Sequence, residues 1–349
     1  MRTYLYLAIL IISFLSVSPK LPDEPDLVIE TTSKGAELLS LKYKGKEYLY
    51  DRSFTWEQSS PVLFPIVGRL RDGHYMLNGN TYNMSIHGFA NYMEFEKLGE
   101  HSYKLTSNED TLAQYPFEFE LYVTYTIDKN KLCYNYTVVN TNPDETMLFG
   151  IGGHPGFKCD YYKEKCEVEF EEEEDNIKVL PIDATVGLMT HDVIDGKTVL
   201  VDKKYLKIKK DSFKNDAIVF TDIKSKNVFL KDDGKKILKF NREQFKYLGV
   251  WSAVGEAPYV CLEPWYDLPD FVNSTMEFTE KEGIIHLEPT KKFEVGFSVE
   301  ILDNDGDDST SDESPSDSDS DSTIIPTGVS TNLKSIPLLM FIGLLFILI

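Results

Sequence analysis

Residues 117–127 read FEFELYVTYTI, in which every second residue is hydrophobic. This alternation is typical of a β-strand, because successive side chains of a strand point to opposite faces of a sheet. The turn-forming residues 128–131 (DKNK) follow, and residues 132–138 (LCYNYTV) alternate again. The stretch therefore predicts a long antiparallel hairpin with one buried face.

The same short-strand pattern continues through residues 22–301. Asn78-Gly79 is the strongest short-range hairpin signal, whereas only residues 59–64 and 109–114 could form short helices. Because we see no linker, we predict a single all-β domain over residues 22–301, either a sandwich or a barrel. Further candidate strands are residues 27–32, 39–44, 168–171, 217–220, 227–230, 247–251, 259–262 and 292–300.

The composition argues against several classes of function. The 349 residues carry a net charge of −21, and such an acidic surface disfavours binding to nucleic acid and to anionic membrane faces. The glycine-rich residues 150–156 lack the Lys-Ser/Thr pair of a phosphate-binding loop. The cysteines are not spaced as in a zinc site. We therefore expect no nucleotide and no metal.

The two ends of the chain predict export and anchoring. Residues 1–18 combine Arg2, an apolar run and small residues at the end, which predicts a signal peptide; an uncleaved signal anchor is the alternative. Residues 303–335 form a predicted disordered stalk, whose first part is almost only Asp, Ser and Thr. The apolar residues 336–349 resemble a GPI-anchor signal, with a short tail anchor as the alternative. We expect the protein at the cell surface, attached to the membrane only through this tail.

Cysteines and glycosylation sequons agree with a secretory route. The chain has four cysteines, an even count that permits disulfides. Cys159 and Cys166 flank a short loop and could close it, although buried free thiols are an equal alternative. The other cysteines are Cys133 and Cys261, and the sequons begin at Asn83, Asn135 and Asn273.

One histidine stands in an unusual setting. Residues 150–157 read GIGGHPGF, so glycines and a proline surround His154. Glycine allows close approach of the backbone to a ligand, and proline fixes the backbone. We therefore predict a shaped loop that presents His154, rather than a strand that buries it.

Three further motifs give this histidine a context. They are FPIVGR at residues 64–69, HGF at residues 87–89 and EPW at residues 263–265. Together with GGHP at residues 152–155, they resemble the aldose 1-epimerase (galactose mutarotase) family, over about residues 27–301. The resemblance implies a large, twisted antiparallel β-sandwich, the supersandwich of the galactose mutarotase type, with a sugar site in a cleft. It also implies an isomerase that interconverts sugar anomers without a cofactor.

The resemblance assigns the two catalytic roles to Glu263 and His154. Opening the sugar ring requires that the hydroxyl on C1 loses a proton while the ring oxygen gains one. Glu263 would be the base and His154 the acid. Because the sugar edge has to fit between them, we expect their polar atoms roughly 5–8 Å apart.

The resemblance also implies a set of residues that bind the sugar. His87 would hydrogen-bond the sugar near the ring oxygen. Arg69 would bind hydroxyls, although it could instead be a structural partner of Glu263, and Arg71 is the less favoured choice. Asp216 is either an acidic sugar ligand or part of a solvated turn.

Two tryptophans are candidate walls of the cleft, because aromatic faces pack against the C–H faces of sugars. Trp265 is the favoured wall, whereas for Trp251 we prefer core packing. Asp267 stands where we expect a glycine in this branch of the family, a departure that would alter the cleft rim.

The leading hypothesis is thus a cell-surface mutarotase for a free hexose, glucose or galactose. A hexose-6-phosphate 1-epimerase is one alternative, which the net charge of −21 disfavours by repelling phosphate. A catalytically silent carbohydrate-binding protein is the other. It has no need of both proton-transfer groups, so the complete set of Arg, His, His and Glu favours the enzyme.

Overall fold

The predicted hairpin lies in the middle of the largest sheet. The computed structural model describes residues 26–302, and within them β9 (Phe119–Asp128) and β10 (Lys131–Asn140) pair in continuous antiparallel register. The alternating hydrophobic residues of β9 are buried from Phe119 to Tyr125, whereas Ile127 near the turn is exposed. The local alternation therefore predicted both the pairing and the buried face.

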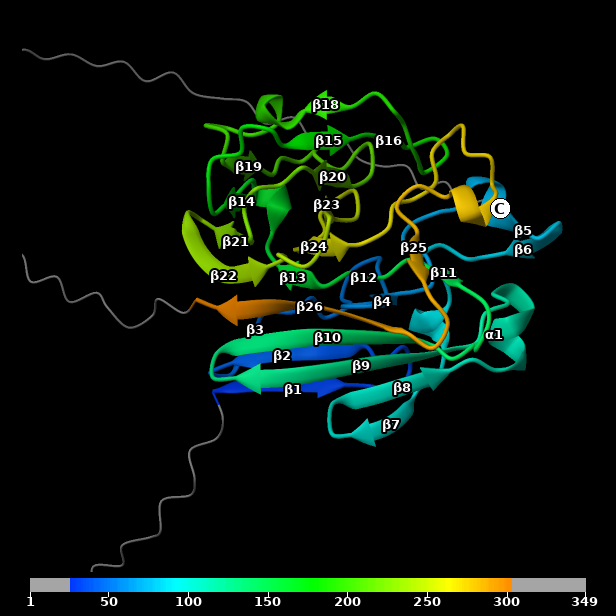
Figure 1. The fold of residues 1–349 in the computed structure, drawn as a ribbon. Helices are drawn as coiled ribbons and strands as arrows, with labels where there is room; N and C mark the ends of the chain where they lie inside the picture. The colour runs from blue at the N-terminus through cyan, green and yellow to red at the C-terminus, as the bar shows by residue number, and fades with distance from the viewer. Residues whose placement is uncertain (1–25, 303–349) are drawn as a thin grey trace, which may run out of the picture. The chain divides into compact units, whose positions relative to one another are not determined.

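Within the described residues, this hairpin belongs to a nine-stranded antiparallel sheet (Figure 1). In spatial order its strands are β19 (Tyr205–Lys207), β14 (Cys166–Phe170), β21 (Asn227–Asp232), β22 (Lys235–Asn241), β26 (Lys292–Ile301), β10, β9, β8 (Ser102–Thr106) and β7 (Glu96–Gly99).

A second, eight-stranded sheet packs on the first. Its strands are β18 (Ile194–Asp195), β15 (Lys178–Leu180), β20 (Ile218–Thr221), β23 (Tyr247–Trp251), β24 (Tyr259–Trp265), β12 (Gly152–Gly153) and β4 (Val62–Leu63), with β13 (Gly156–Lys158) paired to β24 beside β12. The two sheets make the predicted antiparallel β-sandwich.

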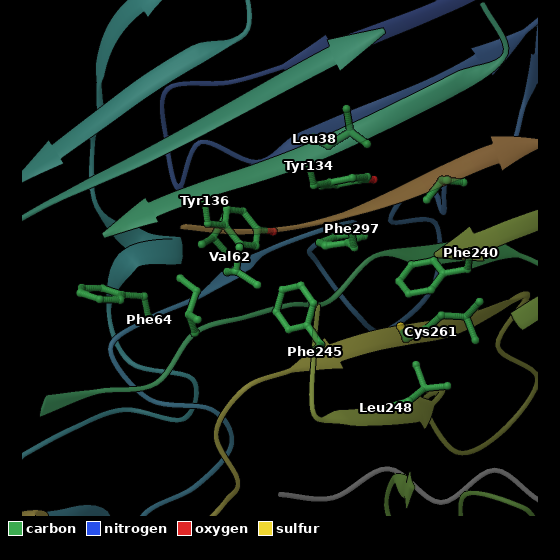
Figure 2. Close-up of a cluster of buried hydrophobic side chains, with 14 of the residues drawn as sticks. Leu38, Val62, Phe64, Tyr134, Tyr136, Phe240, Phe245, Leu248, Cys261 and Phe297 are labelled. Carbon is green, nitrogen blue, oxygen red and sulfur yellow. The ribbon is translucent and has the colours of Figure 1, made fainter. Parts of the chain in front are cut away.

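The core lies between these sheets. Figure 2 shows Tyr134 of β10 and Phe297 of β26 on the side of the large sheet, with Val62, Phe245 and Leu248 on the side of the second sheet. The rings of Tyr134 and Phe297 stack with their centroids 4.1 Å apart. All five side chains are at most 3% exposed, and burial of each of the four Val, Leu and Phe side chains contributes about 1.5–3 kcal/mol.

Small sheets and short helical turns complete the described part. The sheets are β1 (Leu27–Thr31) with β2 (Leu38–Tyr43) and β3 (Lys46–Glu47), β5 (His74–Leu77) with β6 (Asn80–Asn83), β11 (Met147–Phe149) with β25 (Ile285–Leu287), and β16 (Ile182–Asp183) with β17 (Leu188–Met189). The α-helix is α1 (Glu109–Gln114), and the 3₁₀ turns are Arg71–Gly73, Ala90–Tyr92, Tyr161–Lys163, Gly196–Thr198 and Phe278–Glu280.

Two predictions made from local sequence patterns are confirmed and one is wrong. Asn78 and Gly79, both with positive φ, connect β5 to β6 as predicted, and α1 occupies the predicted residues 109–114. The short helix considered at residues 59–64 is wrong, because Val62 and Leu63 form β4 in the second sheet. An isolated apolar run of this length fits a buried strand as well as a helix.

The described residues include some of the features that bear on export, namely the cysteines, but not the two ends of the chain. Cys159 and Cys166 form a disulfide, whereas Cys133 and Cys261 are free. Within residues 26–302, no helix is long and apolar enough to cross a membrane. The predicted signal peptide (residues 1–18), stalk (residues 303–335) and apolar tail (residues 336–349) lie outside the described residues.

Candidate active site

The six predicted site residues meet in one cleft of about 260 Å³. They come from the loop after β4, the loop after β6, the segment between β12 and β13, the turn before β20, and β24. They are Arg69, His87, His154, Asp216, Glu263 and Trp265, and the rest of the lining is Trp56, Gln58, Pro61, Ile86, Ile182, Ala217, Trp251 and Pro269.

Glu263 is placed by the alternation of β24. Trp265 lies two residues further on, so both side chains point to the same face of the strand. The opposite residue on β23 is Gly249, where an added Cβ would lie 2.9 Å from the indole ring of Trp265. The glycine thus leaves room for the indole, whose Nε1 donates a hydrogen bond to Oε2 of Glu263 at 3.2 Å. Glu263 is only 1% exposed.

His154 lies directly opposite Glu263 because of strand register. Gly152 pairs with Trp265 and Gly156 pairs with Cys261. His154 is midway between the two glycines, so it faces Glu263, which is midway between their two partners. Nε2 of His154 lies 3.2 Å from Oε2 of Glu263. The predicted separation of roughly 5–8 Å is therefore wrong, since cross-strand neighbours are in direct contact.

The setting of His154 also differs from the predicted loop. The residues on either side form two short strands, β12 and β13, and the side chain is 6% exposed. It lines the cleft nevertheless. The glycines serve to bring this segment against β24, and the histidine is both buried in a strand-like segment and presented to the cleft.

Burial makes the charged state of each partner costly. Burial raises the pKa of the Glu263 carboxyl well above its usual value, and the nearby charge of Asp216 raises it further. Burial lowers the pKa of His154 well below its usual value, with a contribution from His87. Burial therefore favours the arrangement in which the proton of the pair resides on Glu263, next to a neutral His154.

His87 is held as a neutral hydrogen-bond donor. The backbone N–H of Gly68 donates to Nδ1 of His87 at 3.0 Å, so the proton of the neutral ring is on Nε2. Burial, and then the charge of Arg69, lowers the pKa of His87 to about 4. The rings of His87 and His154 meet edge to face, with centroids 5.4 Å apart.

The charged residues considered for the cleft differ in the partners of their side chains. The exposed side chain of Arg69 makes no hydrogen bond or ion pair with the described residues, so it is not a structural partner of Glu263. Asp216 is half-buried and accepts a hydrogen bond from the N–H of Ala217 at 2.8 Å. Arg71 donates instead to the carbonyl of Ser274 and does not line the cleft.

All three tryptophans of the chain line the cleft. Trp56 packs over His154 with ring centroids 4.9 Å apart, and Trp251 meets His154 edge-on at 5.5 Å. Trp251 packs against the hydrophobic core, as preferred from the sequence, and its half-buried side chain also lines the cleft. Sequence reasoning missed Trp56, which stands in no motif; a survey of the few tryptophans could have found it.

Asp267 does not lie on the cleft rim. It is fully buried behind the cleft, where it accepts a hydrogen bond from the N–H of Val67 and lies 3.3 Å from Nζ of Lys281. The same lysine reaches Asp270, whose other carboxylate oxygen accepts from the N–H of Arg71. The unexpected carboxylate thus ties residues 267–270 to residues 67–71, the segment that carries Arg69.

Comparisons with known proteins cover the whole cleft. A model of the aldose 1-epimerase family matches residues 21–286. Protein LacX, in its plasmid form, from Lactococcus lactis subsp. lactis is 29% identical over 293 residues, covering 79% of this chain and 97% of that protein.

Two solved structures are similar to this chain in both sequence and fold. A galactose mutarotase related enzyme from Lactobacillus acidophilus is 30% identical with a TM-score of 0.72, over 80% of this chain and 96% of that one. A galactose mutarotase-like protein from Lactobacillus casei is 25% identical with a TM-score of 0.74, over 80% and 98% of the two chains. The shared fold confirms the predicted β-sandwich of the galactose mutarotase type.

Proposed function

The chain belongs to the aldose 1-epimerase family, and we propose that it interconverts the α and β anomers of a free, uncharged hexose by acid–base catalysis. Family membership supports an isomerase that acts on carbohydrates. The observation that carries the finer proposal is the contact of 3.2 Å between His154 and Glu263, two buried proton-transfer groups in a cleft lined by three tryptophans.

The pair needs one proton in total. When a sugar enters, its hydroxyls join the indole of Trp265 as donors to Glu263, and hydrogen bonds to a carboxylate favour its charged form. The proton then passes across the contact to His154. This makes Glu263 the base and His154 the acid, although the proton is on the carboxyl before the sugar binds.

The reaction follows from these states. Glu263 takes the proton of the hydroxyl on C1, His154 gives its proton to the ring oxygen, and the bond between C1 and the ring oxygen breaks to leave an aldehyde. Rotation about the C1–C2 bond exposes the other face of the carbonyl. The same steps in reverse close the ring and return both protons, so that no cofactor takes part.

The other predicted residues position the sugar. His87 offers its Nε2–H as a donor, because Nδ1 is already occupied by the N–H of Gly68. Arg69 has free donors, and Asp216 offers a free carboxylate oxygen beside the one that binds Ala217. Trp56 and Trp251 supply aromatic surface for the C–H face of the ring.

The charges of the lining favour an uncharged substrate. Among the described residues, Arg69 is the one lysine or arginine that lines the cleft, which also holds Asp216 and Glu263. A phosphate group is usually bound by several cationic or N–H donors. The net charge of −21 would also slow the approach of an anionic sugar.

Polarimetry of freshly dissolved α-glucose and α-galactose tests the proposal. We expect the protein to accelerate the approach to the anomeric equilibrium beyond the spontaneous rate, and glucose 6-phosphate to be a much poorer substrate. If the protein accelerates only the reaction of glucose 6-phosphate, it is a hexose-6-phosphate 1-epimerase. Calorimetric sugar binding without any acceleration would establish the silent carbohydrate-binding protein.

We also propose a secretory route to the outer face of a membrane. The disulfide between Cys159 and Cys166 is typical of an oxidising compartment. The acceptor residues of all three sequons, Asn83, Asn135 and Asn273, are exposed. Removal of N-glycans should increase gel mobility, and a phosphatidylinositol-specific phospholipase should release the protein from intact cells. Retention on cells whose known GPI proteins are released would favour a tail helix instead.

A further inference from the structure

Cys261 is a buried thiol that the proposed reaction does not use. It lies on β24 two residues before Glu263, so both side chains point to the same face. Its cross-strand neighbours are Gly156 and Trp251. It is fully buried and free of any disulfide. The thiol is therefore next to the proton-transfer pair.

Three different ligand types converge at this point. The sulfur of Cys261, a ring nitrogen of His154 and a carboxylate oxygen of Glu263 all lie within 4.8 Å of one another. In a tetrahedral zinc site with bonds of about 2.0–2.3 Å, ligand atoms are about 3.3–3.8 Å apart. The contact of 3.2 Å between His154 and Glu263 is already close to this length, and the sulfur lies no more than 4.8 Å from its partners.

Unused binding capacity is a second, independent observation. Among the described residues, Oε1 of Glu263 is a buried carboxylate oxygen without a hydrogen-bond partner, beside the Oε2 that contacts His154. Buried polar atoms are normally satisfied. The cleft reaches both side chains and gives an ion a path to the site.

The chemistry of the three side chains suits a divalent ion. A complex of a divalent ion with one thiolate, one carboxylate and one neutral imidazole has no net charge, which avoids the cost of a buried charge.

We propose that His154, Cys261 and Glu263 form an inhibitory site for a thiophilic divalent cation such as Zn²⁺. Imidazole, thiolate and carboxylate are the ligands that Zn²⁺ and Cd²⁺ prefer, and water or a sugar hydroxyl completes the tetrahedron from the cleft. Mg²⁺ and Ca²⁺ require more oxygen ligands and do not bind. The ion occupies both groups that transfer protons, so the enzyme stops; this consequence rests on the proposed function, whereas binding does not.

Binding is tested first, by titrating the full chain with Cd²⁺ in the absence of reductant. We expect an ultraviolet thiolate-to-metal charge-transfer band, lost in Cys261→Ser and Cys261→Ala and retained in Cys133→Ser. Cys133 is the other free cysteine, so its variant is a matched control. Circular dichroism checks the folding of each variant, and two different substitutions guard against failure of one. Absence of the band from the wild type, or its persistence in a folded Cys261 variant, overturns the site.

Inhibition is tested next, by polarimetry with added Zn²⁺ or Mg²⁺. Zn²⁺ should inhibit the wild type and Cys133→Ser, whereas Mg²⁺ should not. Cys261→Ala should need at least about tenfold more Zn²⁺ for half inhibition, since even residues that only hydrogen-bond to a metal ligand change metal affinity by about 10–100-fold. A Cys261-dependent band without inhibition overturns the inhibitory role. A Cys261-dependent band in a protein that does not catalyse mutarotation refutes the proposed function and leaves the metal site standing.

Discussion

Replacement of Glu263 by Gln tests the catalytic pair most directly. The amide has nearly the size of the carboxyl, its oxygen can still accept the hydrogen bond from Trp265, and its N–H can donate to Nε2 of His154. Because burial favours the protonated form of Glu263, a neutral amide should change the free energy of unfolding by no more than about one hydrogen bond, 0.5–1.5 kcal/mol.

Catalysis should respond far more strongly, because an amide cannot accept the C1 proton at neutral pH. One acid–base group typically contributes about 10²–10⁴-fold, equivalent to about 3–5 kcal/mol of transition-state stabilisation. We therefore expect Glu263→Gln to bind sugar nearly normally and to lose catalysed mutarotation by that factor. The measurement is the rate of change of optical rotation minus the spontaneous rate, alongside calorimetric sugar binding.

A matched control is available away from the cleft. Glu174 is also fully buried, and its two carboxylate oxygens accept hydrogen bonds from the N–H groups of Lys224 and Ser225. Glu174→Gln loses one of these bonds and should be less stable, yet keep its mutarotation rate. If Glu263→Gln turns over sugar like the wild type, the base is a different residue and the reasoning fails.

Three further outcomes are expected. His154→Asn should lower the catalysed mutarotation rate by a factor comparable to that of Glu263→Gln. The rate of the double variant should fall little further, since the effects of groups that act as a unit are not additive. If polarimetry shows that the two losses multiply, the two residues do not act as a pair. Between about pH 6.5 and pH 4 the unfolded chain takes up a proton at His87 that the folded protein, with a pKa of about 4, does not. Stability should therefore fall by at most about 3 kcal/mol as the pH falls through this window, and urea unfolding should show no such component in His87→Gln. Replacement of both Cys159 and Cys166, seven residues apart, by Ala should cost about 2.5 kcal/mol in the same assay without slowing mutarotation; a slower rate would link this loop to the cleft.

Sequence reasoning succeeded where the signal was local. The alternation of residues 117–127 fixes one face of β9, and Asn78-Gly79 supplies the positive φ values that its turn requires. The ordered motifs supplied the family, which the comparisons confirm. Their catalytic and binding roles stay predictions, although the structure brings all six residues together.

The remainder depended on strand register, which one sequence does not reveal. The contact between His154 and Glu263 follows from the pairing of β12 and β13 with β24. This pairing brings two residues that are over a hundred positions apart in the chain to within 3.2 Å of each other. The place of Asp267 had the same origin, since its partner Lys281 reaches it only through the fold. Trp56 stands in no motif. A survey of the tryptophans could have made it a candidate, but its position over His154 follows only from the fold.

The position of β26 has a consequence for how the chain is made. This strand is the last of the described part, yet it lies between β22 and β10 and joins the two halves of the nine-stranded sheet (Figure 1). Until residues 292–301 leave the ribosome, two internal edges of that sheet have unpaired N–H and C=O groups, and Phe297 is missing from the core. Exposed edges of this kind recruit other chains. During synthesis the nascent protein is therefore prone to aggregation until β26 is inserted into the sheet.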